Sequence, residues 1–282
     1  MNRLHVLATG PLVTVQDRGR PGFAHLGVPR AGALDAPAAA LANRLVGNGP
    51  DDAVLEVLLG GLALRADVGC WVALTGAGRD HPVAEWLPAG ATLRVDPPAT
   101  GVRSYLAVAG GIAVPPVLGS RSSDTLAGVG PARVEAGAVL PVGEPRGRPR
   151  PMDAPRPPTP GPLRVHPGPR ADWFVADALA RLCAATYVVA ADSNRVGLRL
   201  EGPALPRRRD GELASEGMVH GAVQVPPSGR PVVFLADHPP TGGYPVLGVV
   251  DADDLWQCAQ LRPGEQVRFT PAPPPASAAA RR

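Results

Sequence analysis

The stretch AVLEVLLGGLALRA, residues 53–66, carries the pattern that decides the fold class. Two short apolar runs flank Gly60 and Gly61, and neither run has the length of an ordinary helix. Apolar runs of about four to eight residues bounded by glycine are typical of strands, and a Gly-Gly pair between two of them is a hairpin signal. We therefore predict two strands joined by a turn at Gly60 and Gly61.

The same rhythm of short runs and turns continues on both sides of this stretch. Strands are predicted at 4–9, 70–76, 92–96, 103–114, 163–168, 186–192, 195–202, 221–229, 231–237, 244–251 and 265–271. Short helices are predicted at 35–48, capped by Asp35 and ended by Gly47, at 172–183, capped by Asp172, and at 252–261. The 34 glycines and 36 prolines mostly separate these elements. We expect a mainly β fold with short helices, in which two halves of similar composition form two related β-barrels.

Residues 143–162, GEPRGRPRPMDAPRPPTPGP, differ from the rest of the chain because they hold eight prolines, four arginines and almost no large apolar residue. This composition favours an extended, semi-rigid linker. We predict an N-terminal barrel at 1–142, the linker at 143–162, a C-terminal barrel at 163–272 and a disordered tail at 273–282.

The basic residues are all arginine, because the sequence contains no lysine. Without lysine the chain has no P-loop lysine, no Schiff-base lysine and no residue on which biotin could be carried. We therefore expect that no biotin is attached to this chain, and that any P-loop ATP site belongs to another chain.

Charge and cysteine content narrow the class of protein further. The net charge is +3 and the arginines are scattered among acids, so nucleic-acid binding is not expected. The three cysteines lie far apart without a CxxC pair, which argues against a disulfide scaffold or a zinc site, and no metal site is predicted. No signal-peptide core and no run of about 18 apolar residues is present, so we expect a cytoplasmic protein without a membrane partner.

Four polar clusters framed by glycine or proline are the candidates for chemistry. They comprise Gln16, Asp17, Arg20 and Asp35; Arg121, Ser122, Ser123 and Asp124; Ser193, Asn194 and Arg195; and Asp237, His238, Thr241 and Tyr244. Aspartate and asparagine in such turns often bond only their own backbone, and an arginine can simply pair with a neighbouring acid. Arginine beside hydroxyl or amide groups, however, recurs in three of the loops, and this combination binds carboxylate and carbonyl oxygens. We predict a site for a small anionic or amide substrate, without a named reaction.

Several motifs together resemble the biotin-dependent carboxyltransferase family, also called the allophanate hydrolase subunit 2 family. The matching segments are TVQDRGRPGFAHLGVPRAGALD, NRLVGN, YLAVAGGI, LGSRSSDT, GPRADWF, SNRVGLRLEGP, EGMVHGAVQVPPSGRPVVFLADHPPTGGYP and RPGEQVRF. They follow one another in order from about residue 4 to residue 270. The resemblance implies two cyclophilin-like β-barrel halves in tandem.

Within this family the motifs are most similar to the C subunit of the ATP-dependent 5-oxoprolinase. That resemblance implies a hydrolase component that is active in a heteromeric complex with an A subunit and a paralogous, β-rich B subunit. Such a complex uses ATP to open the lactam of 5-oxo-L-proline to L-glutamate. Two alternatives stay open: half of a biotin-dependent carboxyltransferase that acts on urea or a similar amide, and a non-catalytic regulator that antagonises a kinase-inhibitor-like partner.

The resemblance also assigns roles to the polar clusters. The predicted catalytic residues are Gln16, Asp17, Asp35 and Asp237, and the predicted substrate-binding residues are Arg20, Arg121, Ser122, Asn194, Arg195, Gln224, Thr241 and Tyr244. Arg20 and Arg195 are expected to hold a carboxylate, and Gln16 and Asp17 to orient the amide. The sequence departs from the family pattern at Ala31, Leu34 and Pro240, where serine, methionine and threonine are usual.

Overall fold

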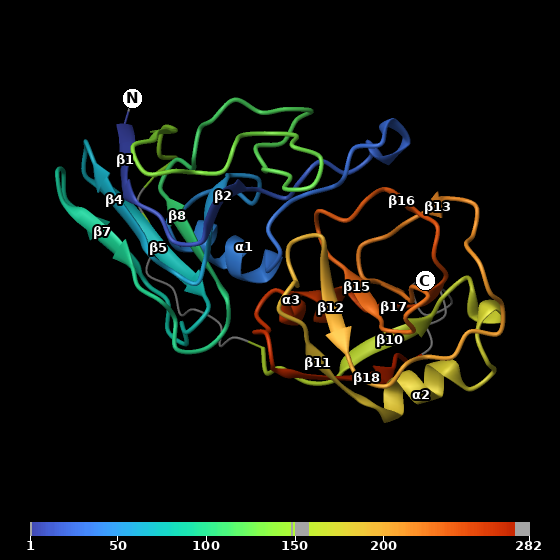
Figure 1. Cartoon of the computed structure of the whole chain (residues 1–282). Helices are drawn as coiled ribbons and strands as arrows, with labels where there is room; N and C mark the ends of the chain where they lie inside the picture. The colour runs from blue at the N-terminus through green and yellow to red at the C-terminus, as the bar shows by residue number, and fades with distance from the viewer. Residues whose placement is uncertain (1, 148, 150–157, 274–282) are drawn as a thin grey trace, which may run out of the picture. The chain divides into compact units, whose positions relative to one another are not determined.

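The computed structural model describes residues 2–147, 149 and 158–273 (Figure 1). The chain divides into two compact units: unit 1 is Met1–Thr159 with Trp256–Arg262, and unit 2 is Pro160–Leu255 with Pro263–Arg282. The prediction of a mainly β fold with short helices is confirmed. Most of the predicted linker, at 148 and 150–157, and the predicted tail at 274–282 lie outside the described residues.

Unit 1 contains two antiparallel sheets rather than one closed barrel. The four-stranded sheet has the order β7-β4-β1-β9, with β1 at Asn2–Ala8, β4 at Leu62–Ala66, β7 at Thr92–Val95 and β9 at Val139–Val142. The five-stranded sheet has the order β2-β3-β8-β5-β6, with β2 at Leu12–Gln16, β3 at Val54–Leu58, β5 at Cys70–Gly76, β6 at Ala84–Leu87 and β8 at Arg103–Val108. Strand β2 is therefore an edge strand that leads directly into the polar opening loop.

The hairpin predicted at Gly60 and Gly61 is wrong, because β3 and β4 belong to different sheets. Leu59, Gly60 and Gly61 all have positive φ angles, of 53°, 71° and 83°. A Cβ atom at Gly60 would lie 2.5 Å from the backbone of Asp96, so glycine is required there. The three left-handed residues make a corner that carries the chain from one sheet to the other.

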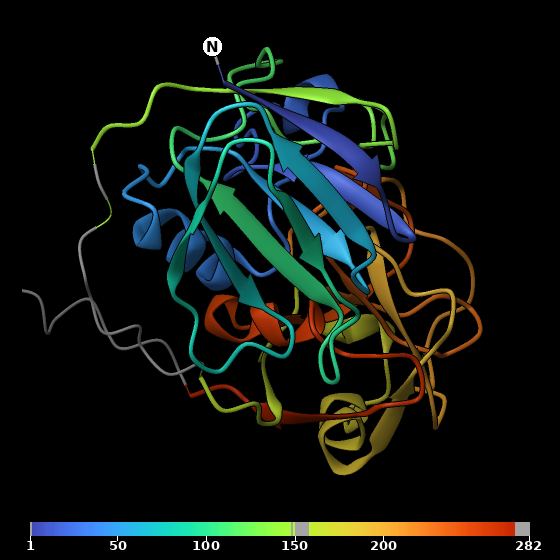
Figure 2. The same ribbon diagram turned by 90° about the vertical axis from the view of Figure 1, so that its left-hand side faces the viewer.

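The side chains of the five-stranded sheet alternate between two buried layers. Leu55, Val57 and Leu106 join the core that the two sheets share. The opposite face packs against helix α1, Ala36–Leu45, in a second apolar cluster. Figure 2 looks onto unit 1, where the strands cross one another and α1, in blue, lies beside them. Because both faces are covered, every side chain of β8 is buried.

Unit 2 is a closed barrel of seven strands in the order β10-β17-β14-β15-β12-β11-β18, and this part of the tandem-barrel prediction is confirmed. The strands are β10 at Leu163–Pro167, β11 at Thr186–Val189, β12 at Gly197–Glu201, β14 at Ala222–Gln224, β15 at Val232–Phe234, β17 at Val246–Val250 and β18 at Gln266–Pro271. A separate pair consists of β13 at Glu216–Gly217 and β16 at Thr241–Gly242. The other helices are α2, Ala178–Ala184, and α3, Leu255–Cys258, and single 3-10 turns occur at Ala24–Leu26, Ala171–Trp173 and Ala252–Asp254.

The predicted helix starts are confirmed at one position and wrong at another. Asp35 is the N-cap of α1, and its carboxylate accepts a hydrogen bond of 3.0 Å from the backbone amide of Ala38. Helix α2 begins at Ala178, with Asp177 rather than Asp172 in the N-cap position. The reason is that Phe174 is buried and has extended backbone angles, so a helix cannot run through it from Asp172.

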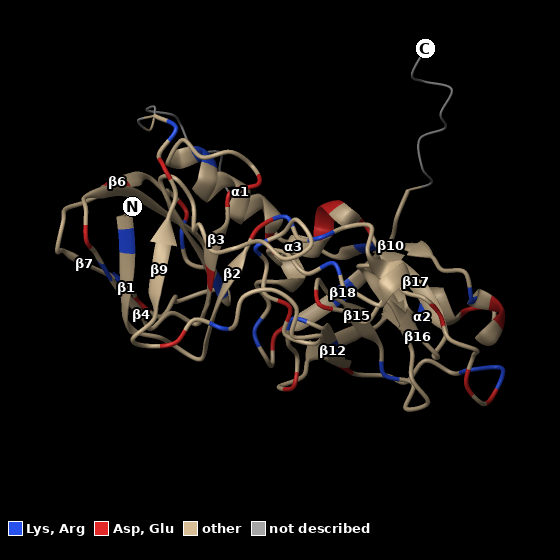
Figure 3. Cartoon of the chain, turned by 90° about the horizontal axis from the view of Figure 1, so that it is seen from above, with Lys and Arg blue, Asp and Glu red and all other residues tan. Residues whose placement is uncertain are grey.

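Charged residues are interspersed in both units. Figure 3 shows arginine in blue and aspartate and glutamate in red at scattered positions along the ribbon of each unit. Within the described part of the chain, no helix has the length and apolar character needed to cross a membrane.

Candidate functional site

A row of polar side chains lies on the face of the five-stranded sheet that carries α1. Strand register pairs Thr14 with Glu56 and Glu56 with Tyr105, so the three side chains point to the same face. Gln16 follows Thr14 by two residues and also lies on this face. All four residues are buried. The alternation of the strands therefore gathers a polar cluster near the first turn of α1.

Glu56 and Tyr105 are the centre of this cluster. The Oε2 atom of Glu56 accepts hydrogen bonds from the backbone amide of Leu34 at 3.0 Å and from the hydroxyl of Tyr105 at 2.9 Å. The Tyr105 hydroxyl in turn accepts a hydrogen bond of 2.8 Å from the amide of Asp35. The guanidinium of Arg103 lies 3.4 Å from the other carboxylate oxygen of Glu56. These contacts fix the N-terminus of α1 against strands β3 and β8.

Gln260 belongs to unit 1 although it follows most of unit 2 in the sequence. Its Oε1 atom accepts hydrogen bonds of 3.0 Å from the amides of Val102 and Arg103. Its Nε2 atom donates to the carboxylate of Asp35 at 2.8 Å and to the carbonyl of Arg103 at 3.0 Å. Arg103 also donates to the carbonyl of Ala259 at 2.7 Å. The side chain of Gln260 thus bridges the start of β8 and the N-cap of α1.

Burial changes the proton affinity of two groups in the cluster. The pKa of Asp35 is raised above its usual 3.8, chiefly because burial penalises the carboxylate, while the bonds from Gln260 and Ala38 act in the opposite direction. The pKa of Tyr105 is held well above its usual value, first by burial and then by the charge of Glu56. Tyr105 therefore keeps its proton and donates it to Glu56 in a hydrogen bond, whereas the ionised form of Asp35 is disfavoured.

The opening loop and the loop of residues 117–124 are joined through Asp17. Its Oδ1 atom accepts hydrogen bonds from the amide of Gly19 at 2.8 Å and from the hydroxyls of Ser120 and Ser122 at 2.6 Å each. Its Oδ2 atom accepts from the amide of Arg121 at 2.5 Å. Two of the sequence-predicted clusters are thus brought together. Through these hydrogen bonds Asp17 holds the two loops together. Its predicted catalytic role stays a prediction.

Two of the arginines predicted to bind substrate donate hydrogen bonds to backbone carbonyls of unit 1. Arg20 is 2% exposed and its guanidinium donates to the carbonyls of Val117, at 3.4 Å, and Ser122. The side chain of Arg121 donates to the carbonyl of Val114 at 2.8 Å. Both arginines therefore help to hold the 117–124 loop. Their predicted role in substrate binding stays a prediction.

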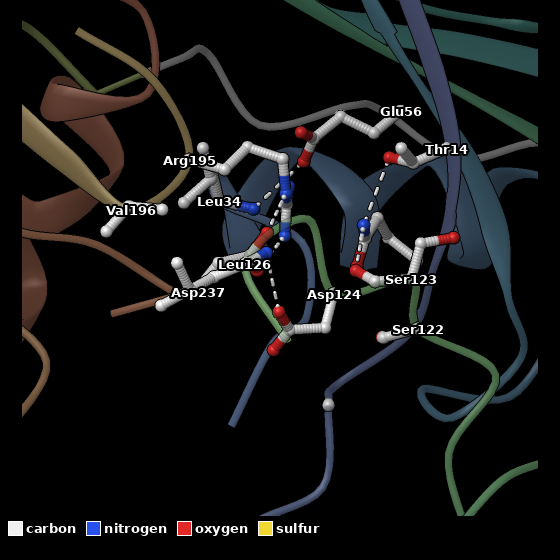
Figure 4. Close-up of polar contacts among 12 residues, drawn as sticks. Thr14, Leu34, Glu56, Ser122, Ser123, Asp124, Leu126, Arg195, Val196 and Asp237 are labelled. Carbon is white, nitrogen blue, oxygen red and sulfur yellow. Dashed lines mark hydrogen bonds and ion pairs between the residues drawn. The ribbon is translucent and has the colours of Figure 1, made fainter. Parts of the chain in front are cut away.

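Gln16 is anchored by a residue of its own strand, Thr14, and by Ser123 on the 117–124 loop. Its Nε2 atom donates to Thr14 Oγ1 and to the carbonyl of Ser123, each at 3.0 Å, and Figure 4 draws the two bonds as dashed lines in the space between Thr14 and Ser123. Ser123 is held in turn by its amide, which donates to the carbonyl of Val15 at 2.9 Å. The amide of Gln16 consequently has one fixed orientation.

In unit 2 the predicted residues Arg195 and Asp237 form a buried ion pair (Figure 4). Two hydrogen bonds of 2.9 Å join the guanidinium to the two carboxylate oxygens, and the side chains are 2% and 0% exposed. Paired arginine and carboxylate in this forked geometry are strongly oriented. Asp237 thus sets the direction of the Arg195 guanidinium.

The other candidate residues of unit 2 that are described next include both exposed and buried side chains. Asn194 is exposed, and its side chain accepts from the amide of Val196 at 2.9 Å, the self-bonded turn that the alternative interpretation expected. Gln224 is buried and donates to the carbonyl of Tyr244 at 3.2 Å. Thr241 is exposed on β16. His238 is buried and its ring stacks against that of Phe234.

Four residues of the unit 1 cluster were missed by reasoning from the sequence: Glu56, Arg103, Tyr105 and Gln260. A signal was present for Glu56, because a single charged residue inside the apolar run AVLEVLL needs a buried partner. For the other three no local pattern distinguishes them from surface residues. Their contact with Asp35 depends on the strand register and on the return of the chain at 256–262.

Two of the departures from the family pattern, Ala31 and Leu34, belong to unit 1, and the third, Pro240, belongs to unit 2. Ala31 and Leu34 are buried, and Ala31 has a positive φ of 52°. The carbonyl of Pro240 accepts a hydrogen bond of 2.8 Å from the amide of Met218.

The class of protein follows from comparison with known families. The family described as carboxyltransferase domain, subdomain A and B, matches residues 26–271. The chain belongs to this carboxyltransferase family, and the family resemblance inferred from the motifs is confirmed.

Particular relatives can be named within the class. The C subunit of 5-oxoprolinase from Escherichia coli (strain K12) is 38% identical over 94% of this chain and 90% of its own length. The crystal structure of TTHA0988 matches with a TM-score of 0.84 and 41% identity over 96% of this chain, which spans about half, 55%, of that chain. The urea carboxylase of Kluyveromyces lactis matches with a TM-score of 0.86 and 30% identity over 95% of this chain and 27% of that chain.

Proposed function

We propose that the chain is the C subunit of an ATP-dependent 5-oxoprolinase and helps to convert 5-oxo-L-proline to L-glutamate. The observation that carries the proposal is the 38% identity to the C subunit of the E. coli 5-oxoprolinase, which extends over 90% of that protein. The name of that relative implies a complex, and we propose a paralogous B subunit and an A subunit as the partners. Because the chain has no lysine, ATP would be bound by P-loop chemistry only in another component of the complex.

The buried charges support a small polar substrate for this chain. Asp237 orients the guanidinium of Arg195, and a guanidinium held in one direction binds a carboxylate with good geometry. Arg195 in unit 2 and Arg20 in unit 1 are the two candidates for binding a substrate carboxylate, and Gln16 in unit 1 is the candidate for orienting an amide. Asp17 is the least suited to touch the substrate, because its carboxylate already accepts four hydrogen bonds.

The proposal is tested by glutamate release from 5-oxoproline and ATP in mixtures of the A and B subunits, with and without this chain. We expect release that requires the chain and that survives addition of avidin. Arg195→Lys keeps a positive charge beside Asp237 but removes the forked guanidinium. Turnover should therefore fall about tenfold or more, because one charge-assisted hydrogen bond is lost. The exposed Arg199 pairs with Asp192, and Arg199→Lys is the matched control with unchanged turnover. Release that does not depend on the chain would refute the proposal.

A second function is favoured by the similarity to urea carboxylase. In this alternative the chain is half of a biotin-dependent carboxyltransferase that transfers a carboxyl group to urea or a similar amide. Carboxybiotin would come from another protein, because this chain has no lysine to carry biotin. Activity with urea that avidin abolishes would support the alternative and contradict the oxoprolinase assignment.

A further inference from the structure

Two buried polar atoms in unit 1 have no hydrogen-bond partner within the part of the chain that the structure describes. They are Oε1 of Gln16, a residue that is 0% exposed, and Oγ of Ser123, which is 3% exposed. Such atoms are rare in folded proteins, and each calls for an explanation such as a bound water, a ligand or a catalytic role. Here the two atoms belong to residues that are hydrogen-bonded to each other.

The orientation of the Gln16 amide is set by its neighbours. The carbonyl of Ser123 can only accept a hydrogen bond, so the amide nitrogen of Gln16 must face it, at 3.0 Å. The same nitrogen donates to Thr14 Oγ1 at 3.0 Å. The oxygen Oε1 is therefore left as an acceptor in a fixed position.

Ser123 is also held through its backbone, while its hydroxyl is not used. Its amide donates to the carbonyl of Val15 and its carbonyl accepts from Gln16. The preceding serine behaves differently, because the hydroxyl of Ser122 donates to Asp17 at 2.6 Å and accepts from the Asp17 amide at 2.9 Å. Adjacent serines thus offer one hydroxyl that braces the loop and one that is available to a ligand.

We propose that Gln16 and Ser123 recognise the amide edge of a lactam, a step that rests on the proposed function and deepens it. A lactam ring holds its amide in the cis form, so the ring N–H and the carbonyl oxygen point to the same side. Gln16 Oε1 accepts from the ring N–H, and the Ser123 hydroxyl donates to the ring carbonyl. Ser123, a member of the second polar cluster to which the sequence analysis assigned no role, becomes a specificity-determining residue.

Access to this pair requires movement of the chain between β8 and β9. Both atoms are shielded from solvent, and Ser123 lies in this connection. The same connection carries Leu118 and Leu126, which are 42% and 49% exposed, and Leu118 has a positive φ of 50°. Leu118 is a strained residue and both leucines are exposed, whereas Ser120 and Ser122 of the same connection are buried and held by Asp17. Because a bound ligand would hold this segment closed, we expect 5-oxoproline to slow backbone amide exchange at 117–127.

The first test is Ser123→Ala in the full chain, assayed with the A and B subunits. Because the hydroxyl has no partner in the described part of the chain, we expect no loss of melting temperature. We also expect the KM for 5-oxoproline to rise about three- to tenfold, because the variant loses one neutral hydrogen bond to the substrate. Ser122→Ala should lower the melting temperature, since it breaks the brace to Asp17. Ser228→Ala, in an exposed turn of unit 2, is the control with unchanged KM and melting temperature.

The second test examines the acceptor Oε1 of Gln16 with the lactone of the same ring and carboxylate. This compound has a ring oxygen where the lactam has N–H, so it would face Gln16 Oε1 with a second acceptor and should compete at least about tenfold more weakly than the lactam. Equal competition by the lactone would overturn the assignment to Gln16. Equal melting losses for Ser122→Ala and Ser123→Ala would show that Ser123 Oγ has a structural partner, which would also overturn it.

The tests separate this inference from the proposed function. If wild-type mixtures release glutamate and Ser123→Ala does so with unchanged KM, the inference fails and the proposed function stands. If wild-type mixtures release none, the proposed function fails. In that case the inference is still decided by calorimetry, which measures the binding of 5-oxoproline and of urea to the wild-type chain and to Ser123→Ala. Weaker binding to the variant supports the inference. Equal binding to the two chains, or no binding to either, contradicts it.

Discussion

At the scale of single residues, the buried carboxylates of Glu56 and Asp35 in unit 1 have different surroundings. Glu56 is compensated by the guanidinium of Arg103 at 3.4 Å and by two hydrogen-bond donors. For Asp35, burial is the largest influence on the pKa and the charge of Arg103 is the smallest. The side chain that caps α1 is therefore the one for which ionisation is unfavourable in the folded chain.

This difference predicts a pH dependence of stability. Because the pKa of Asp35 in the folded chain is raised above 3.8, the folded chain binds this proton more tightly than the unfolded chain does. The stability contributed by Asp35 is present below about pH 4 and is lost as the pH rises through the folded-state pKa. In urea unfolding between about pH 4 and pH 7, Asp35→Asn should thus gain stability relative to wild type as the pH rises.

The control for this prediction is Asp251, whose pKa is lowered chiefly by a hydrogen bond from His166. The stability that Asp251 contributes is present above the unfolded-state pKa and is lost as the pH falls below it, so in unfolding below about pH 4 Asp251→Asn should lose stability relative to wild type as the pH rises. Slopes of the same sign in the two variants would contradict the assignment of Asp35.

At the scale of elements, the segment Trp256–Arg262 acts on unit 1 much as an additional strand would. Gln260 makes with its side chain the kind of paired contacts to Val102 and Arg103 that a backbone peptide makes in a sheet. Arg262 extends the contact by donating to the carbonyls of Gly101 at 2.8 Å and Pro98 at 2.6 Å. The start of β8 is therefore held by side chains from a distant part of the sequence.

Removal of these contacts should be costly. Gln260→Ala leaves two backbone amides and the Asp35 carboxylate without their partner, and we expect a loss of about 2–4 kcal/mol in the free energy of unfolding. Amide exchange at Val102 and Arg103 should become faster. The exposed Gln266 on β18 is the matched control, and Gln266→Ala should change stability by less than about 0.5 kcal/mol. Similar effects of the two substitutions would show that Gln260 does not hold β8.

The elements differ in how far their sequence predicts them. Helix α1 could be predicted because its signals are local: Asp35 at the N-cap, proline in the first turn and a glycine after the end. The corner at Leu59, Gly60 and Gly61 could not, since glycines permit a hairpin as readily as a corner and the choice depends on which strands pair later in the chain. The cluster around Glu56 is set by strand register and by Gln260, and only the lone charge in an apolar run indicated it.

At the scale of the whole molecule, unit 1 is built from two separate parts of the sequence. A chain that ends at Thr159 lacks the partners of Asp35, Val102 and Arg103 that Ala259 and Gln260 supply. We expect such a fragment to form the two sheets but to show faster amide exchange at β8 than the full chain. Equal protection of β8 in the fragment and the full chain would contradict the role given to Trp256–Arg262.

The two-part construction of unit 1 also orders events during protein synthesis. The ribosome completes the last strand of unit 1 well before it makes Gln260, and at about 5–20 residues per second the intervening stretch of roughly 100 residues takes on the order of 5–20 seconds. During that interval Arg103 and Asp35 keep their contacts with Glu56 and Ala38 but lack those that Ala259 and Gln260 supply. Because a chain interrupted in this interval lacks the contacts of Trp256–Arg262, we expect proteases to cleave its unit 1 faster than that of the full chain.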